Sequence, residues 1–266
     1  MRAYMKFRKY IIIVTLGILI FFVLSFINGF AGNPVSKLLV NQAAQKYVEE
    51  HYADFDLTMN KAVYNFKDGK YHVNVKSKTS IDTHFSIAFS GTGKFIDDEY
   101  NELVLSKWNT GQRIDDAYRK LADTVLESED FPYDSDIAFG EMLDKGITID
   151  DLEIDKKYDI KELAKEKGHI VLYVYSNTLD VPTLTQTLLD VKKLFDAKDV
   201  PFNMIDLTLQ LPRTEERKTN DSIITLDFLY QDIYADGLQG RVQNNVDKTK
   251  AYYQELDKEK NAEMEK

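Results

Sequence analysis

The stretch HIVLYVYSNTLDVPTLTQTLLDVKKLFDAKDVPFNMIDLTLQL, residues 169–211, predicts a β-strand, an α-helix and a second β-strand in succession. Its first part, HIVLYVYS, is a continuous apolar run of the kind found in strands buried on both faces. Asp180 is a good N-cap for the helix, and Pro182 suits its first turn. Apolar residues then recur at helical spacing until Pro201 ends the helix: Leu184, Leu188, Val191 and Phe195.

The residues that follow predict a further strand and a last helix. In SIITLDFLYQDIY, residues 222–234, the apolar side is expected to carry Ile224, Leu226, Phe228 and Tyr230. Residues 212–221 are expected to form an exposed hairpin tip before this strand, and the final helix should end near Lys260. The order β-α-β-β-α is similar to the split-βαβ arrangement of ferredoxin-like folds with one strand missing. Residues 137–143, IAFGEML, are the candidate for that strand.

The first half of the chain predicts a helix on a sheet, in the order α-β-β-β. Asn33 and Pro34 are a suitable N-cap and first residue for a helix that ends near Tyr52. Three strand patterns follow, and Asp68-Gly69 between the first two is a strong hairpin signal. They are LTMNKAVYNF, YHVNVKSK and IDTHFSIAFS, residues 57–66, 71–78 and 81–90. Residues 97–127 then read as helical, so that the fold class is α+β.

Two of the four histidines, His72 and His84, lie in these strands with Asp82 between them. Because side chains alternate across a strand, all three are expected on faces that are otherwise polar and exposed to water. The alternative is a metal site of two histidines and one carboxylate, if the strand register brings the three together. Solvent exposure is the preferred interpretation.

The N-terminus predicts a membrane anchor. Arg2, Lys6, Arg8 and Lys9 precede an uncharged apolar run over residues 10–30, which is long enough to span the ~30 Å core of a bilayer. The positive-inside rule places the N-terminus in the cytoplasm and the rest of the chain outside, as a single-pass membrane protein. A cleaved signal peptide is the alternative, although its apolar region would be shorter.

Composition narrows the function classes. The chain of 266 residues has no cysteine, which excludes disulfides, thiol nucleophiles and zinc–thiolate sites. Without the four N-terminal basic residues, 30 basic residues face 44 acidic ones, and a net charge of −14 disfavours nucleic acid as a partner. An acidic, irregular stretch from Glu127 to Asp159 predicts the domain boundary. The expected parts are a tail and anchor at 1–31, a first domain at 32–130 and a second at 131–266.

Several segments together resemble the YfjL-like family: YNFKDGKYHV, SIDTHFSI, LSKWNTGQRIDDAYRKL, YDSDIAFGE, GHIVLYVYS and LDFLYQDIY. The resemblance covers most of residues 32–255. It implies a membrane-anchored protein of Gram-positive bacteria with two exterior domains, and it carries no activity, cofactor or functional residue with it.

No catalytic motif is present. The chain lacks GxSxG, SxxK and HExxH, so we name no catalytic, cofactor-binding or metal-binding residue. The expected function is a non-enzymatic binding or interaction module of the cell envelope, whose partner is an envelope protein or peptide. The alternative is a hydrolase of wall polymers that uses paired carboxylates between Asp134 and Asp155.

Overall fold

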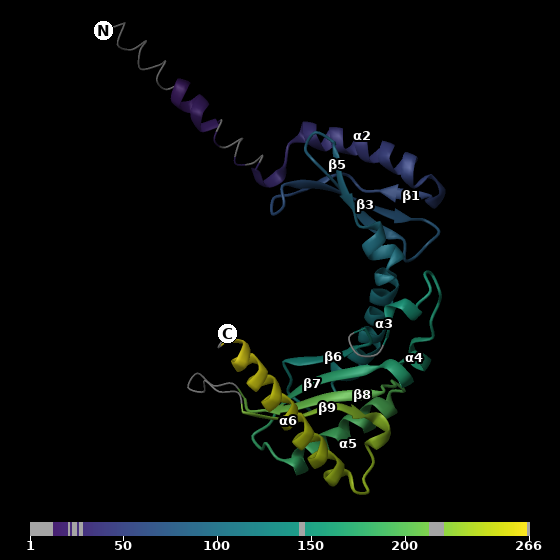
Figure 1. The fold of residues 1–266 in the computed structure, drawn as a ribbon, viewed down its shortest axis with the longest axis vertical. Coiled ribbons are helices and arrows are strands. Elements are labelled where there is room, and N and C mark those ends of the chain that lie inside the picture. The colour runs from purple at the N-terminus through teal and green to yellow at the C-terminus, as the bar shows by residue number, and fades with distance from the viewer. Residues whose placement is uncertain are drawn as a thin grey trace, which may run out of the picture. The chain divides into compact units, whose positions relative to one another are not determined.

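The computed structural model describes residues 13–20, 22, 26, 29–143, 147–212 and 221–264 (Figure 1). The chain divides into two compact units, Met1–Asn109 and Thr110–Lys266. Each unit has its own sheet and its own hydrophobic core. The α+β class expected from the sequence therefore describes the architecture, and each unit is described below by itself.

The predicted transmembrane helix is wrong. No helix within the described ranges has both the length and the apolar character needed to cross a membrane. The basic flank and residues 21, 23–25 and 27–28 lie outside the described residues. The single-pass topology, which rested on that helix, is corrected with it.

The first unit is a helix packed on an antiparallel sheet. The strands are β1 (Leu57–Met59), β2 (Val63–Asn65), β3 (Lys70–Ser77), β4 (His84–Phe89) and β5 (Phe95–Asp98). They are arranged in the order β1-β3-β4-β5, and β2 also pairs with β3. The helix α2 (Pro34–His51) covers one face, while a short 3-10 helix (Ala53–Phe55) and a π-helix (Asn101–Leu105) lie at the connections.

Local sequence explains α2 and its orientation. The Asn33 side chain accepts a hydrogen bond from the Val35 amide, and Pro34 occupies the first turn as predicted. Val40, Ala44 and Val48 recur at four-residue spacing and form the buried stripe of the helix. They pack on alternate residues of the central strands, including Val73, Val75, Phe85 and Ile87.

Two strands differ from the prediction. The single strand expected over residues 57–66 is divided, because the Ala62 amide donates to Asn41 Oδ1 of α2 at 2.8 Å instead of continuing the ladder. The fifth strand, β5, includes Asp97 and Asp98, where the sequence predicted the start of a helix. A turn closed by Gly93 N–H donating to Ser90 O positions it, and Gly93 has φ +80°, which glycine adopts without strain.

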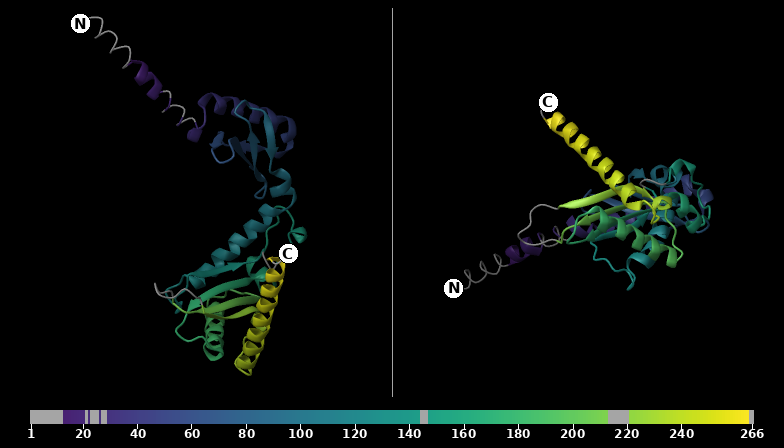
Figure 2. Two further views of the ribbon diagram at one scale, coloured as in Figure 1. Left: turned by 60° about the vertical axis from the view of Figure 1, so that its left-hand side comes forward. Right: turned by 90° about the horizontal axis from the view of Figure 1, so that it is seen from below.

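The second unit contains a four-stranded sheet. Its strands are β6 (Ile137–Glu141), β7 (His169–Tyr175), β8 (Met204–Gln210) and β9 (Ser222–Leu229), in that spatial order. Its helices are α3 (Trp108–Leu126), α4 (Ile160–Lys167), α5 (Val181–Ala197) and α6 (Leu238–Met264), with 3-10 turns at Ile149–Asp151 and Tyr230–Asp232. Figure 2 shows α5 and α6 beside this sheet in two further views.

The predicted β-α-β unit over residues 169–211 is present, but the split arrangement is wrong. In a split unit another strand lies between the two parallel strands. Here β7 and β8 are parallel and directly adjacent, with Ile170 opposite Ile205. The strand predicted at residues 137–143 exists as β6, yet it pairs antiparallel with the outer side of β7. The predicted hairpin tip lies mainly in residues 213–220, outside the described residues.

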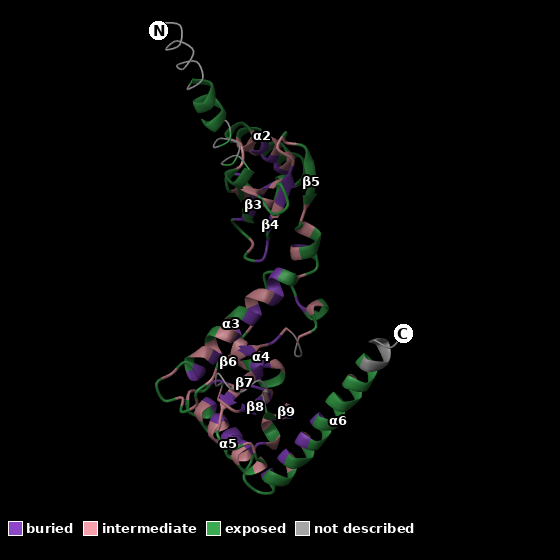
Figure 3. Ribbon diagram, turned by 90° about the vertical axis from the view of Figure 1, so that its left-hand side faces the viewer, coloured by how far each residue is buried: buried purple, intermediate pink, exposed green. Residues whose placement is uncertain are grey.

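The two compact units meet between Asn109 and Thr110, whereas the sequence predicts a domain boundary after residue 130. The reason is the apolar stripe of α3, because Ile114, Tyr118 and Ala122 are fully buried in the core of the second unit. Tyr118 also donates its hydroxyl hydrogen to Pro201 O at 3.1 Å. Figure 3 shows this buried stripe along α3, and it shows α6 buried only in its first turns.

Candidate functional site: the outer groove of the first sheet

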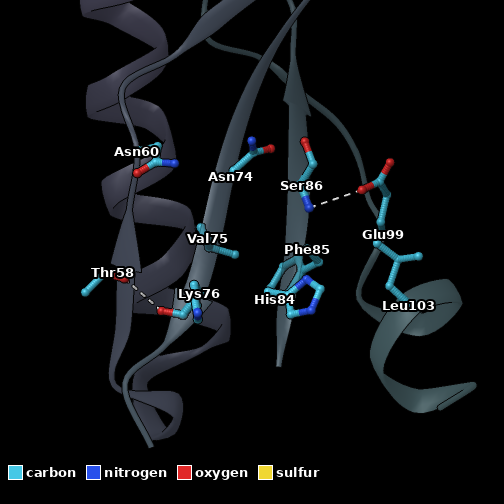
Figure 4. Close-up of a pocket in the computed structure, with 10 residues that line it drawn as sticks. All are labelled: Thr58, Asn60, Asn74, Val75, Lys76, His84, Phe85, Ser86, Glu99 and Leu103. Carbon is cyan, nitrogen blue, oxygen red and sulfur yellow. Dashed lines mark hydrogen bonds between the residues drawn. The ribbon is translucent and has the colours of Figure 1, made fainter. Parts of the chain in front are cut away.

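The first sheet carries a hollow of about 570 Å³, which we call the outer groove (Figure 4). Residues of β1, β3 and β4, together with the segment after β5, line it. They are Thr58, Asn60, Asn74, Val75, Lys76, His84, Phe85, Ser86, Glu99 and Leu103. Most of these side chains are polar, so the groove is a polar surface over a β-sheet floor.

The two-residue period of the strands explains this polarity. Val73 and Val75 of β3 are buried beneath α2, whereas Asn74 and Lys76 between them are exposed. In β4, Phe85 is buried and His84 is exposed. The prediction that His72 and His84 lie on polar faces is confirmed, since His84 is exposed and the His72 side chain keeps 27% of its accessible surface.

One end of the groove is basic. Lys76 and His84 are direct partners in the antiparallel register of β3 and β4. Figure 4 shows both side chains at the same end of the hollow. Thr58 Oγ1 donates to Lys76 O at 2.9 Å, which holds β1 against this end of β3. A cationic ammonium group and an imidazole therefore lie side by side on the sheet surface.

The other end of the groove presents side-chain amides (Figure 4). Asn74 occupies the exposed side of β3 two residues from Lys76. The backbone N–H of Asn60 donates to the backbone carbonyl of Asn74 at 2.9 Å, which places the two side chains on neighbouring segments. Each asparagine side chain offers two N–H donors and a carbonyl acceptor. This is the donor and acceptor set of a peptide group.

An acidic residue forms the far wall. The Ser86 amide donates to Glu99 Oε2 at 3.2 Å, and the Glu99 amide donates to Ser86 O at 3.0 Å, so the loop after β5 is fixed to β4. The groove therefore has Lys76 and His84 at one end, and Asn60, Asn74 and Glu99 across the other end (Figure 4).

Ser86, His72 and Asp68 form a chain that invites comparison with a serine hydrolase. Ser86 Oγ lies 3.4 Å from His72 Nδ1, and His72 Nε2 lies 2.8 Å from Asp68 Oδ2. The Lys70 amide, which donates to Asp68 Oδ1, and the contact with His72 both lower the pKa of Asp68. However, the Ser86 amide faces the Glu99 carboxylate. An oxyanion forming at Ser86 would meet negative charge instead of free N–H donors.

The alternative metal site of His72, Asp82 and His84 is not assembled. The ring of His72 contacts Asp68 and Ser86, as described, while Asp82 is almost fully buried. Asn109 Nδ2 donates to Asp82 O and to His84 O, at 2.9 and 2.7 Å. The prediction that Asp82 shares a face with His84 relied on the alternation of side chains along a strand. That alternation does not apply to Asp82, because β4 begins only at His84.

The carboxylates considered for a hydrolase do not converge on a cavity. Asp136 accepts hydrogen bonds from the Tyr175 hydroxyl and from Gln210 Nε2, both at 2.8 Å. Glu153 pairs with Lys156, and Glu141 contacts His169. None of the described carboxylates between Asp134 and Asp155 lines the outer groove, the hollow beside Phe202 and Tyr230, or the hollow beside Asp227 and Lys248. Residues 144–146 lie outside the described residues.

The sequence missed the groove itself. Its residues come from four separate segments, and only the pairing of β1, β3 and β4 and the turn before β5 bring them together. The one available signal was the alternation that placed Asn74, Lys76 and His84 on exposed faces.

Comparison with known families covers both units. Residues 7–99 match the YfjL-like N-terminal domain, and residues 117–243 match the YfjL-like C-terminal domain. Comparisons with curated proteins and with solved structures gave no match. The two domain matches occur in family order and cover most of the chain. The chain therefore belongs to the YfjL-like family.

Proposed function

We propose that this protein is a non-enzymatic binding module whose outer groove holds an extended polypeptide segment with an acidic group at one end. The single observation that carries this proposal is the pairing of Lys76 with His84 beside exposed amides. The ligand acts as a partner and is not chemically changed.

The chemistry of the groove supports a peptide as the occupant. An extended chain exposes alternating N–H and C=O groups, which the side chains of Asn60 and Asn74 complement. The floor is a β-sheet surface whose strands set the direction of an extended ligand. An acidic side chain or a terminal carboxylate at the basic end would meet the Lys76 ammonium group, and charge-assisted hydrogen bonds are stronger than neutral ones.

The local electrostatics oppose a nucleophilic mechanism. The Ser86 amide is engaged by Glu99, so it is not available to stabilise an oxyanion, and the Ser86–His72 contact is long for proton transfer. A hydrolase with two carboxylates would need a second acid in the hollow, where Glu99 is the one carboxylate among the lining residues described above.

Binding to immobilised synthetic peptides tests the proposal. Peptides of equal length, with and without one Asp or Glu, are to be compared on the full chain. We expect the acidic peptides to bind, and Lys76→Met to weaken that binding by at least about tenfold, since one charge-assisted hydrogen bond contributes about 1.5–3 kcal/mol.

Lys46→Met is the matched control, because Lys46 is exposed on α2 and α2 covers the opposite face of the sheet. Equal weakening by both variants, or no preference for acidic peptides, would contradict the proposed site.

A further inference from the structure

Four titratable residues form a row across the sheet of the second unit, and each strand contributes one. They are Glu141 of β6, His169 of β7, Asp206 of β8 and Asp227 of β9. His169 Nδ1 lies 2.9 Å from Glu141 Oε1, and His169 Nε2 lies 3.3 Å from Asp206 Oδ2. His169 is 1% exposed, whereas Asp227 is exposed to solvent.

The register of the sheet brings these residues to one face. Glu141 and His169 are direct partners in the antiparallel pair β6–β7, so their side chains share a face. Ile170, Ile205 and Leu207 are fully buried in the helical core. By the period of two, His169 and Asp206 belong to the opposite face.

A β-bulge adds Asp227 to the row. The pairing of β8 with β9 shifts between Ile205 and Leu207, and Asp227 adopts a left-handed backbone with φ 50°. The Asp227 amide donates to Asp206 Oδ1 at 2.6 Å, which leaves Asp206 Oδ2 beside the imidazole. Asn245 of α6 binds both backbone groups of Leu226 and holds the bulge in place.

The donor atoms are close enough to share an ion. One ligand atom each from His169, Asp206 and Asp227 lies within 4.8 Å of the other two. Ligands at about 2.1 Å from a common transition-metal ion cannot be more than about 4.2 Å apart, so only a small contraction is needed. The Glu141 contact at Nδ1 reproduces the carboxylate–histidine–metal arrangement that orients ligand imidazoles.

The charge and the access also suit a cation. Three carboxylates surround a single imidazole, so the row carries excess negative charge even when His169 is protonated. Asp227 also lines a hollow of about 430 Å³ with Asn245 and Lys248, which gives an ion a path from solvent.

We propose that His169 Nε2, Asp206 and Asp227 bind a divalent first-row transition-metal ion, with Glu141 as the positioning residue for the imidazole. A mixed nitrogen and oxygen donor set favours Zn²⁺ or Mn²⁺ over Ca²⁺ and Mg²⁺, which prefer oxygen ligands alone. This site is independent of the outer groove, and its failure leaves the peptide proposal untouched.

Calorimetric titration of the chelator-treated full chain with Zn²⁺ and Mn²⁺ tests the proposal. We expect one ion to bind per chain, more tightly than Ca²⁺ or Mg²⁺, and at least tenfold more weakly in Asp227→Asn. Asparagine tolerates the left-handed backbone at this position, so that variant should fold. The matched control is Asp247→Asn on α6, an exposed aspartate whose change should leave binding intact.

X-ray absorption of the zinc form should then show one imidazole among oxygen ligands. Absence of binding would overturn the site. So would Asp227→Asn or Asp206→Asn variants that bind the ion as tightly as the unchanged chain. A third result would also overturn the site: no metal binds, and His169→Gln has a lower melting temperature than the unchanged chain. In that case His169 would be a protonated imidazole that stabilises the sheet through its ion pairs with Glu141 and Asp206.

Discussion

Lys76 and His84 lie opposite each other on neighbouring antiparallel strands, and both are exposed at one end of the outer groove (Figure 4). Cross-strand partners stabilise a sheet most when they are apolar or oppositely charged, and a lysine beside an imidazole is neither. The pair therefore contributes little to the stability of the sheet. We propose that its role is to offer a positive surface to an acidic ligand.

Asp98 should be a key residue for the stability of the first unit. Its Oδ2 accepts hydrogen bonds from the hydroxyls of Tyr47 and Tyr52, at 2.6 and 2.9 Å, which ties α2 and the residue after it to β5. We expect Asp98→Ala to lower the free energy of unfolding by about 2–3 kcal/mol, because two part-buried hydroxyls lose a charged acceptor. Its exposed neighbour provides the control: Asp97→Ala should change the stability by less than about 0.5 kcal/mol in denaturant titrations.

The same hydroxyls predict a pH dependence. Burial, followed by the hydrogen bond to Asp98, raises the pKa of Tyr47 and of Tyr52 above the ordinary tyrosine value of 10.0. A group with a raised folded pKa contributes stability that is complete below its unfolded pKa and is lost as the pH rises through the folded one. The stability of the first unit should therefore fall above pH ~10. The decline should be shallower in Tyr47→Phe/Tyr52→Phe, and equal slopes in the two proteins would contradict this cause.

Gly140 should be required for the packing of β6 against α3. A Cβ at this position would lie 2.6 Å from Ala122 Cβ and 3.0 Å from the Tyr118 ring. Gly140→Ala is expected to cost about 1–3 kcal/mol, as overpacking of a core usually does. Gly240→Ala in α6 is the control, because no atom lies within 4 Å of the added carbon there. That change should be neutral or stabilise by up to ~1 kcal/mol, since alanine favours helix.

The second unit should fold alone only if α3 is included. A fragment that starts at Trp108 keeps the buried Ile114, Tyr118 and Ala122, whereas one that starts at Glu127 loses them. We expect cooperative thermal unfolding by circular dichroism for the longer fragment and a broad or absent transition for the shorter one. Equally cooperative unfolding of the two fragments would contradict this expectation and would place the domain boundary in the acidic segment after residue 126.

Local patterns predicted those parts of the fold that local physics decides. The run from His169, the cap at Asp180 and the stop at Pro201 sufficed for a strand, a helix and a strand. The exposure of His72 and His84 followed from alternation. The predicted exposure of Asp82 was wrong. Asp82 lies before β4, and it is buried where Asn109 contacts its backbone.

Features that depend on register escaped prediction. Neither the adjacency of β7 and β8 nor the position of β6 is encoded in a single segment. In β9 the expected apolar side included Ile224 and Leu226, but Ile223 and Thr225 are buried, and Phe228 joins them only after the bulge at Asp227. One extra residue in a strand reverses the faces before and after it. The same bulge completes the row with His169, which explains why the row could not be predicted.

Nuclear magnetic resonance of the isotope-labelled chain can show directly whether a polypeptide binds in the outer groove. An acidic synthetic peptide selected for binding is to be added while the side-chain amide signals of Asn60 and Asn74 and the ring signals of His84 are followed. We expect saturable shifts of the signals of these three residues, with the signals of the α2 residues Lys46 and Glu50 unchanged. Shifts confined to α2 or to the second unit, with the groove signals unmoved, would contradict it.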